Sequence, residues 1–137
     1  MELIESQSAT QEAGGLRLTL RTDAALRAGG GGSVLRFDVT DAETGKPASD
    51  LQPYLGAMAH FVLVSEDTRS LLHAHPLEAV SAGVSTVSAH TTFPAAGLYK
   101  VWVQLQRRGQ VVTVPYVLRV QAPEQEAHAQ AAPSHAH

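Results

Sequence analysis

The chain has 137 residues, of which 44% are hydrophobic, and it carries a formal net charge of −3 and no cysteine. This length fits one domain with a hydrophobic core. Lys and Arg are not in excess, so the charge balance argues against a nucleic-acid partner. The absence of cysteine excludes disulfides, thiolate metal sites, iron–sulfur clusters, blue-copper sites and cysteine nucleophiles.

No apolar run approaches the roughly 18–20 residues that a membrane-spanning helix requires. The opening stretch, MELIESQSATQEAGG, has no basic segment followed by an apolar one, so it does not read as a signal peptide. Two locations stay open at this point. The protein is cytoplasmic, or it is extracytoplasmic and its leader has been removed.

The first half of the chain contains two segments with the period of a half-buried strand. Apolar and polar residues alternate in GLRLTLRT (15–22) and in SVLRFDVTD (33–41). Residues 1–14 are polar and are expected to form a flexible arm. AGGGGS (28–33) is expected to be a flexible turn, and PYLGAM (53–58) a short helical turn.

The second half predicts a hairpin and then three further strands. HFVLVSED (60–67) and SLLHAH (70–75) are expected to pair around a turn at Asp67-Thr68. The later strands are STVSAHTTF (85–93), GLYKVWVQLQ (97–106) and GQVVTVPYVLRV (109–120).

About seven short strands predict an all-β fold, an immunoglobulin-like antiparallel β-sandwich over residues 15–120. Tyr99 and Trp102 are the large aromatic residues expected to fill its core. Pro115 indicates an edge strand or a bulge, because proline cannot donate a hydrogen bond to a neighbouring strand. Residues 121–137 are rich in Ala, Gln and His and predict a disordered tail.

Histidines gather around the predicted hairpin. If its strands pair around Asp67-Thr68, His60 faces His75, and His73 lies diagonally opposite His60 on the same side of the sheet. Facing side chains have Cβ atoms about 4.5–5.5 Å apart, which lets two imidazoles reach one ion. A loop one residue different would move His75 to the other face, so the expectation depends on this register.

The histidine pattern predicts a metal site. Neutral imidazole suits copper, zinc, nickel and iron, and the thioether of the nearby Met58 favours Cu(I). His90 can join if its strand lies next to the hairpin. The candidate ligands are His60, His73, His75, Met58 and His90, with copper as the expected metal and zinc as the alternative.

The tail carries His128, His135 and His137. Such a tract can bind Cu(II), Ni(II) or Zn(II) weakly, or it can be an inert solvated end. A flexible tail of this kind can also raise the metal concentration near a folded site.

Three segments together resemble a known family: PYLGAMAH (53–60), SEDTRSLLHAHP (65–76) and FPAAGLYKVWVQLQRRGQVVTVPYVLRV (93–120). They are similar to the YtkA-like and CopC-like immunoglobulin-type domains of bacterial exported proteins, often encoded near copper-efflux genes. The resemblance implies an immunoglobulin-like sandwich, a periplasmic or cell-surface location and a metal-handling role. It places the family histidines at His60, His73 and His75.

The leading hypothesis is therefore a periplasmic copper carrier or buffer with no catalytic step. Its expected partners are the metal ion and a metal-efflux or metal-delivery protein, and a homodimer formed through an edge strand stays open. A structural or interaction sandwich without a metal site is the alternative. A metal-dependent enzyme ranks lowest, because its candidate bases Glu66, Asp67 and Glu78 sit at turns.

Overall fold

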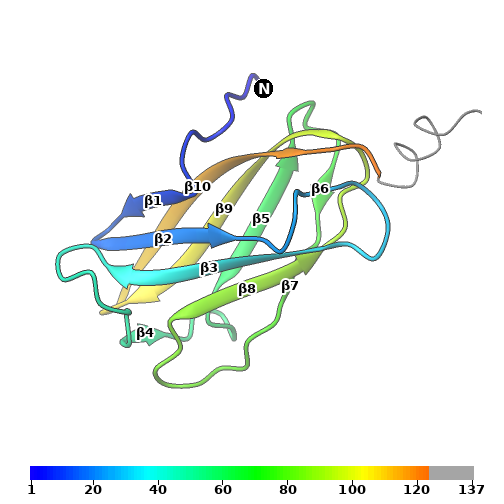
Figure 1. The fold of residues 1–137 in the computed structure, drawn as a ribbon. Coiled ribbons are helices and arrows are strands. Elements are labelled where there is room, and N and C mark those ends of the chain that lie inside the picture. Colours follow the sequence, from blue (N-terminus) through cyan, green and yellow to red (C-terminus); the bar gives the residue numbers. More distant parts are fainter. Residues whose placement is uncertain (124–137) are drawn as a thin grey trace, which may run out of the picture.

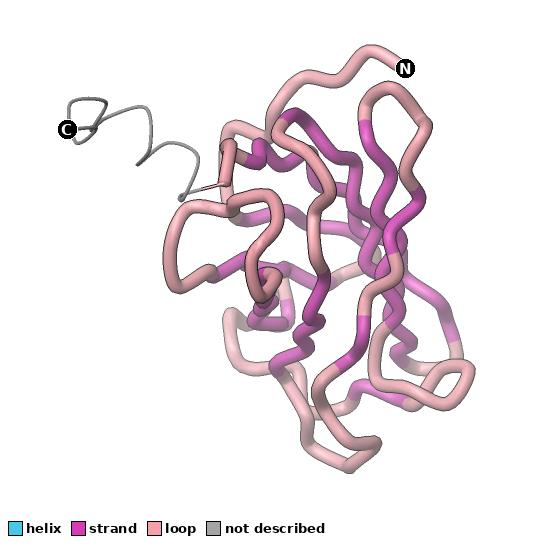
Figure 2. The backbone as a smooth tube through the Cα atoms, turned by 90° about the vertical axis from the view of Figure 1, so that its right-hand side faces the viewer, coloured by secondary structure: helices cyan, strands magenta, loops and turns pink. Residues whose placement is uncertain are grey.

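The computed structural model describes residues 1–123, in which the chain forms strands, turns and loops but no helix (Figures 1 and 2). The described part therefore contains no helix long and apolar enough to cross a membrane. The strands are β1 (Thr10–Ala13), β2 (Leu16–Arg21), β3 (Ser33–Asp41), β4 (Leu51–Gln52), β5 (His60–Ser65), β6 (Leu71–Leu72), β7 (His75–Pro76), β8 (Thr86–Thr91), β9 (Gly97–Arg107) and β10 (Gln110–Val120).

The strands form two antiparallel sheets (Figure 1). The first sheet has the order β1-β2-β3-β8-β7, and the second has the order β10-β9-β5-β6 with β4 also paired to β9. This order matches an immunoglobulin sandwich, in which strands B and E lie in one sheet and strands C, F and G lie in the other. Here β3 and β8 correspond to B and E, and β5, β9 and β10 correspond to C, F and G. The predicted fold class is confirmed.

The core forms where inward-facing residues of the two sheets meet. The long strands β3 and β9 alternate buried and more exposed positions, which is why their period-two pattern is readable from the sequence. The largest fully buried side chains come from both sheets, and they include Phe37 and Leu16 from the first and Tyr99, Tyr116 and Leu63 from the second.

Two buried tyrosines use their hydroxyl groups to fix the backbone. The Tyr99 hydroxyl, at the start of β9, donates to the carbonyl oxygen of Ala95 at 2.7 Å. This is the tyrosine corner of immunoglobulin-like sandwiches, and burial raises the pKa of Tyr99. The Tyr116 hydroxyl lies 2.8 Å from the Leu18 carbonyl oxygen and so connects the second sheet to the first.

A partly buried ion cluster closes one end of the sandwich. Arg107, 8% exposed at the end of β9, donates to Asp41 at 2.5 Å and to Asp50 at 3.0 Å. Its Nη1 also lies 3.4 Å from the Gly15 carbonyl oxygen. The hydrogen bond from Arg107 is the main cause that lowers the pKa of Asp41 to about 2.

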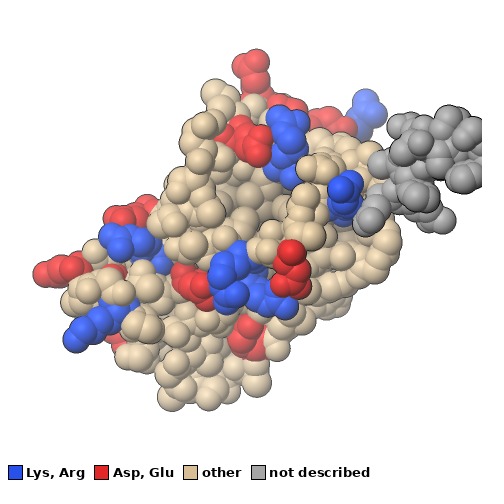
Figure 3. Space-filling view, in the orientation of Figure 1, with Lys and Arg blue, Asp and Glu red and all other residues tan. Residues whose placement is uncertain are grey.

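Charged residues of both signs lie side by side on the face of the molecule seen in Figure 3. On the first sheet and its edge strand, Arg21 pairs with Asp38 at 2.5 Å and Arg17 pairs with Glu12 at 2.7 Å. These pairs are exposed, so each contributes little to stability.

The structure corrects three local predictions. The expected helical turn at 53–58 is a tight β-turn, in which Tyr54 and Ala57 exchange backbone hydrogen bonds and Leu55 has φ +50°. The expected arm at 1–14 includes a strand, because β1 pairs with β2. Trp102 projects from the outer face of the second sheet rather than into the core, since the neighbours Val101 and Val103 take the buried positions.

Pro115 lies in β10, an edge strand of the second sheet, as predicted. The expected tail at 121–137 falls mostly on residues 124–137, which lie outside the described residues together with His128, His135 and His137. Gln121 is described, and its backbone nitrogen donates to the Leu26 carbonyl oxygen at 2.8 Å.

Candidate metal site

The predicted hairpin forms with the predicted register, but it is short. Leu63 pairs with Leu72 and Val64 pairs with Leu71, so facing residues sum to 135 as expected. The pairing of β5 with β6 ends at Leu72.

Beyond Leu72 the chain leaves the second sheet and joins the first. Ala74 packs against the core, and the next two residues form β7, where His75 pairs with His90 of β8. The prediction that His60 faces His75 is therefore wrong. The local spacing was right, but the chain crosses between the sheets before the third pair can form.

His60 lies on the outer face of the second sheet, opposite Gln104 of β9. Its Nε2 lies 2.6 Å from the Tyr54 carbonyl oxygen, and its ring packs edge-on against the Tyr54 ring with the centroids 5.5 Å apart. His60 thus holds the 54–57 turn against β5 and lies on a different sheet from His75.

Met58 is 1% exposed and belongs to the core between the sheets. The core lies against the inner face of the first sheet, whereas His90 and its partner His75 project from the outer face. Ala89 and Thr91, the neighbours of His90 in β8, take the buried positions. The structure therefore does not bring the Met58 thioether to these two histidines.

The other three predicted histidines lie together at the edge of the first sheet. The rings of His73 and His75 are 4.4 Å apart between centroids and nearly perpendicular, at 87°. His75 lies directly opposite His90, a pairing that puts Cβ atoms about 4.5–5.5 Å apart on one face. We call His73, His75 and His90 the edge cluster.

Hydrogen bonds hold the backbone and one ring of the edge cluster in place. The Thr91 hydroxyl donates to the His73 carbonyl oxygen at 2.8 Å. The His90 Nε2 lies 2.7 Å from the Gly31 carbonyl oxygen. A Cβ built on Gly32 would lie 2.6 Å from that same nitrogen, so glycine is required where the loop passes over the His90 ring.

Within residues 1–123 no three His, Asp or Glu side chains stand ready to hold a metal ion. In the edge cluster the reason is ring orientation, since His90 is turned to Gly31 and the other two rings are perpendicular. Metal–nitrogen bonds of about 2.0–2.1 Å place two coordinating imidazole centres about 5 Å apart. His73 and His75 already have nearly that separation and are exposed, so side-chain rotation alone can aim them at one ion.

The three carboxylates considered as catalytic bases have structural partners instead. Glu66 accepts a hydrogen bond from the Leu3 backbone nitrogen at 2.9 Å. Asp67 closes its own turn, and the hydrogen bond from Ser65 is the main cause that lowers its pKa. Glu78 accepts hydrogen bonds from the Ser88 backbone nitrogen and hydroxyl group. Its side chain therefore bonds to β8 just after the end of β7.

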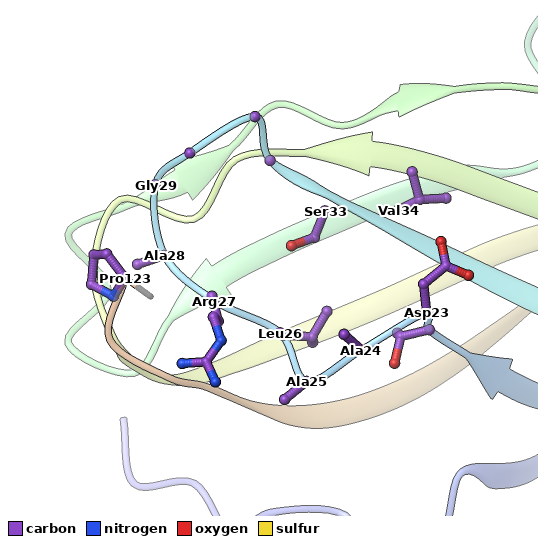
Figure 4. Close-up of a pocket in the computed structure, with 14 residues that line it drawn as sticks. Asp23, Ala24, Ala25, Leu26, Arg27, Ala28, Gly29, Ser33, Val34 and Pro123 are labelled. Atoms are coloured by element: carbon purple, nitrogen blue, oxygen red, sulfur yellow. The ribbon is translucent and has the colours of Figure 1, made fainter. Parts of the chain in front are cut away.

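A hollow of about 450 Å³ lies beside the edge cluster, between the 22–34 loop and Pro123 (Figure 4). Half of the residues that line it are alanine or glycine, and Arg27 and Asp23 contribute charge. The hollow shares the glycine-rich loop with His90 but contains none of the predicted ligands.

These features define a class of protein, an immunoglobulin-like β-sandwich that carries a histidine cluster on the edge of one sheet. The family described as "Domain of unknown function (DUF8832)" matches residues 10–122, and the chain belongs to this family. The resemblance to YtkA-like and CopC-like domains remains an expectation from the sequence.

A solved DUF4426 family protein from Pseudomonas aeruginosa PAO1 has a similar fold, with a TM-score of 0.57 and 10% sequence identity. The similarity covers 84% of this chain and 98% of that one. At this identity the likeness supports the β-sandwich alone. No curated protein matches the sequence.

Proposed function

We propose that the protein is a metal-binding β-sandwich that holds a single Cu(II) or Zn(II) ion at the edge cluster. The observation that carries the proposal is the contact of His73 with His75, combined with the pairing of His75 with His90. These contacts bring three imidazoles to one patch, from β7, from β8 and from the segment between β6 and β7. Imidazole is a common ligand for both metals.

The revised ligand set changes the expected oxidation state. The sequence favoured Cu(I) because of Met58, but that thioether is buried in the core. A site with imidazole ligands alone is better suited to Cu(II) or Zn(II). A carrier or buffer role in an extracytoplasmic compartment, with a metal-efflux or metal-delivery protein as partner, fits an exposed site at a sheet edge.

The test is ion-induced stabilisation in a protein whose tail cannot bind metal. We call the full chain with His128, His135 and His137 replaced by Gln the tail-substituted protein. Its thermal unfolding midpoint should rise saturably with Cu(II) or Zn(II), because ion at about 100 times its Kd adds about 2.7 kcal/mol to the free energy of unfolding. His75→Ala should abolish the rise, whereas His60→Ala, the matched control on the other sheet, should keep it.

An unchanged midpoint with both ions, or a rise that survives His75→Ala, would contradict the proposal. The second outcome would direct attention to other histidines. Testing His73→Ala and His90→Ala in the same background then ranks the three ligands. The expected order places His90 last, because its Nε2 must first leave the Gly31 carbonyl oxygen.

A second candidate function, an interaction module, is favoured by one surface feature. Val62, Trp102 and Pro115 lie in one row across β5, β9 and β10, on the outer face of the second sheet. Val62 is 37% exposed, and the Lys100 ammonium group lies 5.7 Å from the centre of the Trp102 ring. Trp102→Ala should leave ion binding unchanged, so the two functions can be separated.

A further inference from the structure

The edges of the two sheets leave little room for a strand of another chain. The edge strands β1, β6 and β7 have four, two and two residues. The fourth edge strand, β10, is longer, but Pro115 within it has no N–H group. The Ser6 nitrogen also donates to the Val117 carbonyl oxygen at 2.9 Å, and the Val117 nitrogen donates to the Ser6 hydroxyl group at 2.8 Å. Short, interrupted or covered edges resist pairing with another chain, so a second copy is expected to dock on a face of the sandwich.

The two outer faces of the sandwich differ in charge. Ion pairs lie on the outer face of the first sheet, as in the pairs of Arg21 with Asp38 and of Arg17 with Glu12. The strands of the second sheet contain no Asp or Glu. Interface centres are depleted of charged residues and enriched in aromatic ones. The outer face of the second sheet has both properties, because Trp102, the single tryptophan of the chain, lies on it.

Apolar side chains surround Trp102 on this face. Val62 of β5 and Pro115 of β10 lie directly opposite it. Leu71 of β6 faces Val64 of β5, which is two residues from Val62 and therefore on the same side of the sheet. Leu71 is 74% exposed and Val62 is 37% exposed. An apolar strip thus crosses β6, β5, β9 and β10, and such strips are typical of surfaces that contact another protein.

We propose that two copies of this chain form a two-fold symmetric dimer through the outer faces of their second sheets. The inference rests on the second candidate function, the interaction module, and gives it a partner. It does not depend on the ion, whose proposed site is on the other sheet. A two-fold axis along the row of Val62, Trp102 and Pro115 places each of these residues opposite its own copy. Closed two-fold symmetry of this kind is the commonest arrangement of identical chains.

The polar residues on either side of the Trp102 row complement each other in this arrangement. Lys100 precedes Trp102 by two residues and Gln104 follows it by two, so each lies about 7 Å from it along β9 on the same face. The axis exchanges the two directions along the strand, so Lys100 of one copy faces Gln104 of the other. The Gln104 side-chain oxygen can then accept a hydrogen bond from the Lys100 ammonium group. The two Lys100 residues are offset by about 14 Å along the strands, which exceeds the Debye length of about 8 Å at physiological ionic strength.

The size of the face predicts a weak dimer. Strands lie about 4.8 Å apart and rise about 3.3 Å per residue, so the lengths of β5, β6, β9 and β10 give a flat area of about 500 Å² per copy. A standard interface buries about 800 Å² per partner, and transient ones bury less. We therefore expect a dissociation constant in the micromolar range, with monomer and dimer in exchange.

The first experiment is sedimentation equilibrium of the full chain in EDTA, which prevents an ion from linking two copies. Between roughly 1 and 500 μM, a range that brackets a micromolar Kd, the average mass should rise from 14.5 kDa toward twice that value. Trp102 fluorescence should shift to shorter wavelength over the same range, because the second copy removes water from the ring. Val62→Lys sets two ammonium groups opposite each other and should weaken association at least tenfold. Thr19→Lys on the outer face of the first sheet, the matched control, should not change it.

The second experiment tests the two-fold arrangement itself. Gln104→Glu should tighten association about tenfold, because symmetry gives the dimer two new pairs with Lys100. Within one copy the two residues are about 14 Å apart, so the substitution creates no ion pair there. Gln104→Lys should weaken association at least tenfold, and it replaces Val62→Lys if circular dichroism shows that the latter does not fold.

Three results would overturn the inference. A protein that stays monomeric over the whole range would show that this face does not bind a second copy, and it would leave the proposed ion site untouched. Association that survives Val62→Lys and Gln104→Lys would show that the copies meet through another surface. A Kd that is unchanged or weaker in Gln104→Glu would contradict the placement of Lys100 opposite Gln104 of the second copy.

Discussion

His75 lies directly opposite His90 on the outer face of the first sheet, and His60 lies on the other sheet. The pairing depends on a crossing of the chain between the sheets at residues 73–74. This crossing places the candidate site at the edge of the first sheet and not on the predicted hairpin. The rings of His73 and His75 are exposed there. The third ring, that of His90, lies 2.7 Å from the Gly31 carbonyl oxygen, so the site also depends on the loop that passes over His90.

Gly32→Ala should disturb both stability and ion binding. Gly32 has φ +87°, and an added Cβ would lie 2.6 Å from His90 Nε2 and 2.7 Å from the Thr91 carbonyl oxygen. The backbone conformation alone costs an alanine about 1–2 kcal/mol. Chemical denaturation should show at least that loss, and calorimetry should show weaker ion binding.

Gly31→Ala is the matched control for Gly32→Ala. A Cβ at Gly31 meets nothing within 4 Å, and Gly31 is not among the glycines with positive φ. This substitution should be neutral or stabilise the protein by about 0.4–1 kcal/mol, because alanine restricts the unfolded chain. Equal losses in the two variants would contradict the role assigned to the close approach at Gly32.

Ion binding should weaken as the pH falls. A metal ion and protons compete for the imidazole nitrogens, so the affinity for the ion decreases as the pH falls. Zn(II) titrations of the tail-substituted protein at pH 5.5 and 7.5 should give at least a tenfold weaker Kd at the lower pH if two imidazoles bind. A pH-independent Kd would argue for ligands other than histidine.

Acid should weaken the fold through Asp41. Its pKa is lowered to about 2 by the Arg107 hydrogen bond, against about 3.9 in an unfolded chain. A lowered folded-state pKa gives stability that is fully present above about pH 4 and is lost as the pH falls toward 2. Wild type should lose more stability than Asp41→Asn over this range in urea unfolding measured at several pH values. Identical pH dependences would show that this carboxylate does not contribute.

Tyr99→Phe should cost about 0.5–1.5 kcal/mol of unfolding free energy. It removes the hydroxyl group that donates to the Ala95 carbonyl oxygen at 2.7 Å, while the ring and its packing on Phe93 are kept. Tyr54→Phe is the control, since no hydrogen bond of the Tyr54 hydroxyl occurs in the described part of the chain. Urea unfolding of both variants measures the difference, and a Tyr54→Phe loss as large as that of Tyr99→Phe would contradict this assignment.

The fold was predictable because alternation along the strands matches their burial. The same pattern puts Trp102 outside, on the face of Lys100 and Gln104, against the general preference of large aromatic residues for the core. The alternation along β9 was the better guide.

The site was only partly predictable. The hairpin register was correct where the hairpin exists, at Leu63 and Leu72. The sequence HAHP reads as an extended exposed strand in either sheet, and only the packing of Ala74 and the pairing with β8 decide which sheet it joins. Pro76 was a usable signal, because proline favours an edge strand such as β7.

The most direct test of the account is the imidazole nitrogen NMR spectrum of the ¹⁵N-labelled tail-substituted protein, with and without one equivalent of Zn(II). The account predicts that the nitrogen resonances of His73 and His75 shift to metal-bound positions, that those of His90 change as its Nε2 leaves Gly31, and that those of His60 do not move. Unchanged spectra for the edge cluster, or a metal-bound shift at His60 alone, would contradict it.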